Sequence, residues 1–285
     1  MLSESIGKLK RHYGYFMGVI LITFAGTLLI DRILGMFSPV NNQINQLIAN
    51  ANETMTPDQL AQLSQDVFKA QYTGVGGLIA LITMILSAFL RIMQKRSYFQ
   101  KLNFPEMRIA DSAFFHTSPV KIITLPIKSF FANVLGWIAG FLLLTVSGLI
   151  IFQLSQYGNT ASLVSVLIFM LLALVLSVFL VPISYLIAYD VEGKYNFWAT
   201  FTKSLSVAKN NFGRMAKSLI VILLIFIAFF ILIGLLGFVI IDGLGIIVTV
   251  GLLVFLAIIV LIFWVGPLVE VYMVQTLNHI FNREY

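Results

Sequence analysis

Residue types that perform chemistry are sparse in this chain and are not arranged for catalysis. Its histidines, His12, His116 and His279, have no metal-ligating or nucleophilic side chain at helical spacing. Metalloprotease, nucleotide-binding and serine-hydrolase motifs are absent. Several hydroxyl side chains lie within the apolar runs, namely Thr145, Ser147, Ser165 and Ser177. None of these four has a histidine or a carboxylate at the same depth in the runs. We therefore expect no enzyme activity, no catalytic residue, no cofactor and no metal site.

One carboxylate is placed where it could have a function. Glu270 follows Gly266 and Pro267, near the end of a long apolar run that can kink at this point. Ion-coupled carriers normally keep a paired ionisable residue near the middle of the bilayer, and the middles of the apolar runs contain none. Glu270 is our candidate functional carboxylate. The alternative is a solvated or ion-paired anchor at the membrane boundary.

The elements that position these residues follow from composition. Of the 285 residues, 59% are hydrophobic, 11% are charged and none is cysteine, whereas soluble proteins contain about 45–50% apolar and about 25% charged residues. A helix needs about 20 apolar residues to cross a bilayer. Runs that meet or nearly meet this length are residues 13–30, 74–90, 130–153, 161–189, 218–241 and 246–269. They predict an all-α, six-span bundle in one membrane domain, residues 1–285, with the first run interpreted as an uncleaved span.

The charge pattern predicts the orientation of the spans. Lysine and arginine near span ends stay on the cytoplasmic side. With the amino terminus inside, all of the 18 lysines and arginines except Arg32 and Lys69 lie inside. We expect a cell-membrane protein with both termini in the cytoplasm. Its basic inner face should meet anionic lipid headgroups and not nucleic acid.

The loops on the opposite side are short, with one exception. Residues 38–72 are long enough for an extracytoplasmic pair of amphipathic helices, and Thr56 and Pro57 are typical of a helix start. This loop is either a structural cap or a partner site. Short turns after spans three and five predict that spans three and four, and spans five and six, form antiparallel hairpins.

A basic amphipathic segment precedes span five. Helical spacing places one set of apolar side chains on a single stripe: Phe197, Phe201, Leu205, Ala208, Phe212, Met215 and Leu219. The opposite side carries Lys203, Lys209, Arg214 and Lys217. The pattern predicts that residues 195–217 form a cytoplasmic interfacial helix whose basic side contacts anionic lipid, with a bend at Gly213. The alternative is a longer fifth helix that projects into the cytoplasm.

Two short segments of the predicted inner face are similar to each other. Lys128-Ser129 and Lys203-Ser204 are each followed by aromatic residues, an asparagine and a glycine, and each precedes a span. The similarity hints at an internal duplication in which two spans share a basic entry segment.

The sequence SYLIAYDVEGKYNFWATFTKSLSVAKNNFGRMAKSLIVILLIFI, residues 184–227, resembles bacterial multi-pass proteins related to the membrane domain of some glycerophosphodiester phosphodiesterases, common in Gram-positive bacteria. Those proteins have a comparable aromatic, lysine-rich and asparagine-rich helix before a late span. Here Lys209 precedes Asn210-Asn211 where that pattern has glycine and asparagine, and the loop at 38–72 is an addition. The family's catalytic activity resides in a separate soluble domain. The resemblance therefore implies an accessory protein of the bacterial plasma membrane, with no catalytic residue carried over.

These observations favour a non-catalytic membrane protein that assembles with, or regulates, other envelope components. Its expected partners are anionic lipids and either another membrane protein or a second copy of the chain. The competing interpretation is a permease or transporter subunit for an apolar or lipidic substrate. A polar cavity between the spans would favour transport, and a large exposed apolar flank would favour assembly.

Overall fold

The structure is a computed structural model that describes residues 1–37, 74–115, 119–155, 159–190, 194–244 and 246–284, together with Gln62, Gln65 and Lys69. In these residues the regular structure is helical, without a strand. Apart from the three single positions, the predicted outer loop at 38–72 falls outside the described residues. Its two amphipathic helices stay a prediction.

In the part of the chain that the structure describes, six helices are long and apolar enough to cross a membrane, which confirms the predicted all-α, six-span fold. The chain is a multi-pass membrane protein. The long helices are α2 (Tyr13–Gly35), α5 (Gly74–Asn103), α6 (Pro119–Ser155), α7 (Asn159–Tyr189), α9 (Phe212–Leu244) and a sixth made of α10 (Ile246–Val260), η2 (Leu261–Val265) and α11 (Gly266–Glu284). Shorter helices are α1 (Leu2–Arg11), η1 (Ile109–Asp111) and α8 (Phe197–Asn210).

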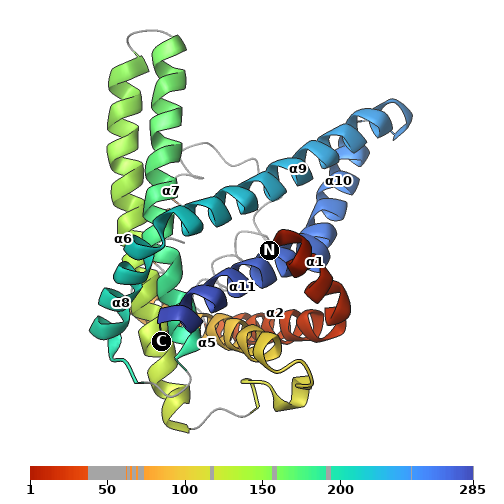
Figure 1. The fold of residues 1–285 in the computed structure, drawn as a ribbon. Helices are drawn as coiled ribbons and strands as arrows, with labels where there is room; N and C mark the ends of the chain where they lie inside the picture. The colour runs from red at the N-terminus through yellow and green to blue at the C-terminus, as the bar shows by residue number, and fades with distance from the viewer. Residues whose placement is uncertain are drawn as a thin grey trace.

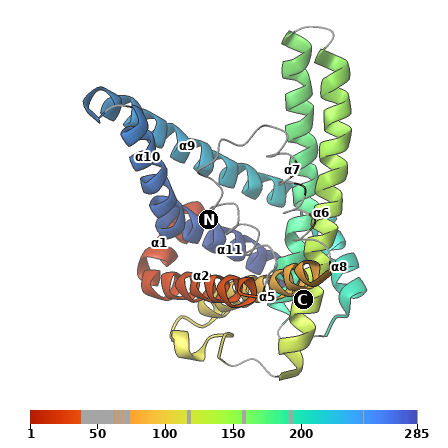
Figure 2. The ribbon, with the colours of Figure 1, turned by 180° about the vertical axis from the view of Figure 1, so that it is seen from behind.

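The long helices pack as three pairs, and these pairs point away from one another (Figures 1 and 2). The pairs are α2 with α5, α6 with α7, and α9 with α10. Only 6% to 17% of the residues in each apolar window are buried, so the expected six-helix bundle forms at one end only. Lipid tails are as apolar as leucine, so purely apolar spans gain little by packing on each other.

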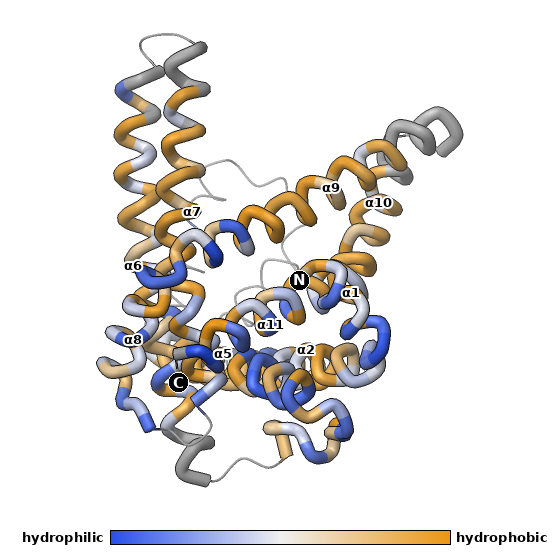
Figure 3. The backbone as a smooth tube through the Cα atoms, in the orientation of Figure 1, coloured by the Kyte–Doolittle hydropathy of each residue, from blue (hydrophilic) through white to orange (hydrophobic). Residues whose placement is uncertain are grey.

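The buried core lies where the three pairs meet, at residues 13–19, 92–101, 178–190, 207–215 and 265–281, hereafter the base. Here α5 packs on α6, α7 and α11, while α7 also packs on α8 and α9. Figure 3 shows that the pairs are apolar along most of their length, whereas hydrophilic residues gather around the base. The base therefore collects the span ends that the charge pattern assigns to one side of the membrane.

Two tyrosines fix the register of the first pair. The hydroxyl of Tyr15 on α2 donates to the carbonyl oxygen of Ser97 at 3.2 Å, and the hydroxyl of Tyr98 on α5 donates to the carbonyl oxygen of Phe16 at 3.1 Å. Both phenols are buried, and buried phenols need such partners. The reciprocal bonds hold α2 and α5 antiparallel.

The two ends of the chain meet in the base. Helix α1 packs on α11, and the hydroxyl of Ser5 donates to Oε1 of Gln275 at 2.7 Å. Ser5 is fully buried at this contact. The amino-terminal and carboxy-terminal helices therefore lie on the same side of the spans.

The kink expected near Gly266 and Pro267 is a π-helical turn. In η2 the Gly266 N–H donates to the carbonyl oxygen of Leu261, five residues earlier. A Cβ atom on Gly266 would lie 2.9 Å from that oxygen. In a π turn the backbone carbonyl oxygens no longer follow the usual α-helical hydrogen-bond pattern. The Tyr13 hydroxyl donates to one carbonyl oxygen of this turn, that of Phe263, at 2.8 Å. The π turn thereby joins the sixth span to the start of α2.

Replacing Gly266 with alanine should destabilise this turn, because the new methyl group meets a backbone oxygen that cannot move independently. We expect Gly266→Ala to lower the free energy of unfolding by about 1–3 kcal/mol, measured by unfolding in mixed micelles. Gly251→Ala on α10 is the matched control, since a Cβ there meets nothing within 4 Å. Equal stability of the two variants would contradict the close contact.

Candidate functional site

The candidate carboxylate, Glu270, lies on α11 and faces α7 within the base. The hydroxyl of Tyr185 donates to its Oε2 at 3.1 Å. Its Oε1 is buried and has no hydrogen-bond partner among the described residues. Sequence analysis placed Glu270 at the boundary of span six but did not identify its neighbours. The structure places it between helices and not in a solvated loop.

A lysine from a third helix completes this group. Lys95 on α5 donates from Nζ to the hydroxyl oxygen of Ser184 at 2.6 Å and lies 4.2 Å from the centre of the Tyr185 ring. Lys95 and Glu270 act on each other electrostatically without forming a direct ion pair. We call Lys95, Ser184, Tyr185 and Glu270 the base cluster. It connects α5, α7 and α11 through one cation, two hydroxyl groups and one carboxylate.

The chemistry of the base cluster favours holding helices together. A cation over an aromatic ring stabilises by about 0.5–2 kcal/mol, more where water is excluded. Among the described residues no group of three or more histidine, aspartate or glutamate side chains is gathered for a metal ion. The parts of the base cluster are arranged to fix positions, with Glu270 as the acidic end.

The predicted interfacial segment is divided between two helices. Helix α8 begins after Asn196, whose Oδ1 accepts the Ala199 N–H at 2.8 Å, and it ends at Asn210. The bend is at Asn211, two residues before the predicted Gly213, and the Asn211 side chain donates to the carbonyl oxygen of Val207 at 3.2 Å. Asparagine bonds its own backbone readily and so competes with helix continuation. Residues 212–217 are the first turns of α9.

The buried face of α8 also differs from the predicted aromatic stripe. The face that packs against α7 consists of Thr200, Ser204, Val207 and Ala208. Small side chains let two helix backbones approach closely, and this explains why larger side chains are displaced to the edge. Of the predicted apolar face, Phe197, Phe201 and Leu205 are half-buried on α8, whereas Phe212 is 39% exposed and Met215 is fully buried on α9.

The displaced aromatic side chains form an exposed edge together with two residues that sequence analysis missed. Ring centres are 5.7 Å apart for Phe131 and Phe197, 5.5 Å for Phe197 and Trp198, and 6.3 Å for Trp198 and Phe201. Trp198 is 67% exposed. Tryptophan is enriched where membranes meet water, and this preference is the signal that could have identified Trp198. We call Phe131, Phe197, Trp198 and Phe201 the aromatic edge.

The basic residues of the segment fall into two groups. Lys209, Arg214 and Lys217 are exposed. Lys203 instead donates to the Tyr195 hydroxyl at 2.8 Å and lies 4.4 Å from the centre of its ring. Lys128 bonds the carbonyl oxygen of the same tyrosine, so the lysines of the two similar Lys-Ser segments meet at Tyr195. Contact of these cations with anionic lipid stays a prediction.

Positive charge also affects the first turn between α1 and α2. Burial lowers the pKa of His12, and the neighbouring charges of Lys101 and Arg11 lower it further. His116 lies outside the described residues.

No known protein family, curated protein or solved structure matches the chain. The resemblance over residues 184–227 stays a prediction. The function therefore has to be inferred from the base, from α8 and from the exposure of the three helix pairs.

Lys95 and Glu270 should be energetically coupled across the base. We expect Lys95→Met and Glu270→Gln each to destabilise the protein, because each leaves the other charge among buried groups. The double variant should lose less stability than the sum of the two single losses. The coupling free energy, measured by unfolding in mixed micelles, should be about 0.5–3 kcal/mol. Glu4 and Lys8, an exposed pair 3.0 Å apart on α1, provide the control. Their coupling should be about 0.3–0.5 kcal/mol, and an equal coupling in both cycles would contradict this role.

Proposed function

We propose that the chain is a non-catalytic protein of the bacterial cell membrane that assembles with, or regulates, other envelope components. Its termini lie in the cytoplasm, and its helix pairs pack on a membrane-protein partner or a second copy of the chain. The observation that carries the proposal is the exposure of the pairs beside a tightly packed base. A large exposed apolar flank was the feature expected of an assembly protein.

Helix α6 illustrates this exposure. Large apolar side chains that are at least three-fifths exposed on it are Trp137, Phe141, Leu144, Leu149 and Phe152. Gly136 and Gly140 lie one helical turn apart. A Cβ atom added to either glycine would meet no neighbouring atom of the described residues within 4 Å. Two small residues at this spacing allow another helix to approach closely. Among the described residues no atom occupies the space beside these glycines, which supports a partner helix at α6.

The basic side supports attachment at the headgroup level. The aromatic edge and the exposed Lys209, Arg214 and Lys217 lie at the same end of the spans as the core. Aromatic rings favour the interface, and each cation near an anionic surface contributes about 1 kcal/mol. In this proposal the aromatic edge and these cations hold α8 and the start of α9 in the inner interface while the pairs reach across the bilayer.

The second candidate is a permease or transporter subunit for an apolar or lipidic substrate. Its support is the base cluster, since intramembrane or boundary ionisable residues that face other helices often mark transport paths. The cluster lies in the packed base and not between the apolar parts of the pairs, so assembly remains the leading proposal.

Photo-crosslinking in the native membrane tests the leading proposal. A benzophenone amino acid replaces Phe141 on α6, Phe230 on α9 or Phe255 on α10, which are 70%, 59% and 62% exposed. The same replacement at Phe16, which is fully buried in the base, is the control. After illumination, adducts are purified and identified by mass spectrometry.

Assembly predicts one recurrent protein partner, in near-equal amount to the chain, from at least one exposed position and not from Phe16. Lipid adducts alone from all three exposed positions, with neither another protein nor a second copy of the chain crosslinked, would contradict the proposal. That outcome would favour the transporter.

A further inference from the structure

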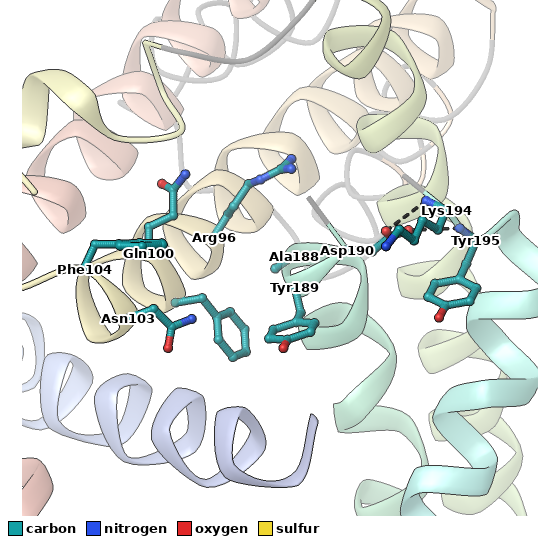
Figure 4. Close-up of a pocket in the computed structure, with 10 residues that line it drawn as sticks. Arg96, Gln100, Asn103, Phe104, Ala188, Tyr189, Asp190, Lys194 and Tyr195 are labelled. Carbon is teal, nitrogen blue, oxygen red and sulfur yellow. Dashed lines mark hydrogen bonds between the residues drawn. The ribbon is translucent and has the colours of Figure 1, made fainter. Parts of the chain in front are cut away.

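A cavity of about 390 Å³ opens at the rim of the base. Figure 4 shows its lining residues, with Arg96 and Gln100 of α5 on one side and residues 188–190 at the end of α7 with Lys194 and Tyr195 on the other. Small-molecule sites have volumes of about 300–1,000 Å³. The cavity is therefore large enough for a small ligand, and it is separate from the base cluster.

The charged lining of the cavity is predominantly basic. Arg96 and Lys194 are its cations and Asp190 is its acidic residue. Arg96 is only 3% exposed. Both oxygens of Asp190 accept backbone N–H groups, from Lys194 at 2.9 Å and from Tyr195 at 3.1 Å. Asp190 therefore shapes the wall of the cavity through the backbone.

Further cations contact a residue that lines the cavity. Lys128 and Lys203 both bond Tyr195, which lines the cavity. Their charges add to those of Arg96 and Lys194, while Asp190 is the carboxylate among the lining residues. Among the described residues, this excess of positive charge in a recess attracts an anion.

The neutral lining residues complete an amphipathic site. The Gln100 Oε1 accepts the Ala113 N–H at 3.1 Å, and this leaves the amide NH₂ as a donor. The Tyr189 hydroxyl is bonded to Asn282 at 2.7 Å, and its ring lies 5.5 Å from that of Phe99. The cavity thus offers cationic and amide donors beside an aromatic wall.

We propose that this cavity binds the phosphate group of an anionic phospholipid headgroup or of a soluble phosphate ester. A guanidinium group presents paired donors that match phosphate oxygens, and a lysine adds a compact charge. The cavity lies at the ends of the apolar helices, the depth at which lipid phosphates are found. This site does not depend on whether the chain has a protein partner.

Binding of phosphate-bearing probes to the full chain tests the proposal. The purified protein in a nonionic detergent is titrated with short-chain phosphatidylglycerol, glycerol 3-phosphate or glycerol, and heat is measured by calorimetry. Arg96→Gln removes the buried cation. Lys194→Gln removes a cation from an exposed residue, so it keeps the test valid if the first variant does not fold. Arg32→Gln is the matched control, because Arg32 is exposed outside the cavity and lies on the opposite side of the spans from the residues proposed to contact anionic lipid.

We expect saturable binding of phosphatidylglycerol, with a Kd raised about tenfold in each cavity variant, since hydrogen bonds to charged groups contribute most strongly. Arg32→Gln should leave the Kd unchanged. Binding of phosphatidylglycerol alone identifies a lipid source, and equal binding of glycerol 3-phosphate identifies a soluble one. Absence of saturable phosphate binding, equal binding of glycerol, or an unchanged Kd in both cavity variants would overturn the proposal.

Discussion

The packing of α5, α7 and α11 against one another is the interaction on which the rest of the structure depends. Each of these helices belongs to, or continues from, a different apolar pair, and each contributes fully buried side chains such as Tyr98, Leu186 and Leu277. The base cluster lies within this packing, and the cavity opens at its rim. Because the pairs pack on one another in the base, their directions are set by how these three helices meet.

The sequence was sufficient for the spans but not for their arrangement. Long apolar runs predict membrane helices directly, and the glycine and proline at 266 and 267 indicated the kink. A helix that is apolar all round carries no marked face, however, so the pattern could not show which sides of α6 or α9 pack. For this reason the sequence led us to expect a bundle of all six spans. Likewise, helical spacing marked the aromatic stripe of α8 as one apolar face, but it could not show that α8 packs on its neighbour through small side chains.

The candidate site was predictable only in part for a related reason. Glu270 stands out in an apolar sequence because a carboxylate at a span end is costly unless it is paired. Its neighbours Lys95 and Tyr185 come from helices far apart in the chain, and spacing within one helix cannot reveal them. In the sequence, Arg96 and Lys194 were two of the many basic residues that predict the orientation of the spans in the membrane. Only the folded base shows that they share one recess.

The basic residues of the base have several roles that charge counting treats as one. Lys95 is held over a ring between helices, Lys128 and Lys203 bond Tyr195, and Arg96 lines the cavity. Lys209 remains exposed, on the surface that is proposed to meet lipid headgroups. A single side of the molecule thereby combines helix packing with the proposed lipid attachment and ligand binding, while the apolar pairs are left for the proposed contacts within the bilayer.

The central claim is that the pairs meet at the base and diverge within the bilayer. Since the chain contains no cysteine, spin labels can be attached to two introduced cysteines, and pulsed electron paramagnetic resonance in lipid nanodiscs measures their separation. One variant labels Val175 and Phe212, near the contact of α7 with α9, and the other labels Val164 and Ile227, farther from the base on the same helices and at matched distances along them. The divergent arrangement predicts a clearly longer separation for Val164 and Ile227. Equal separations in the two variants would show parallel spans and contradict the account.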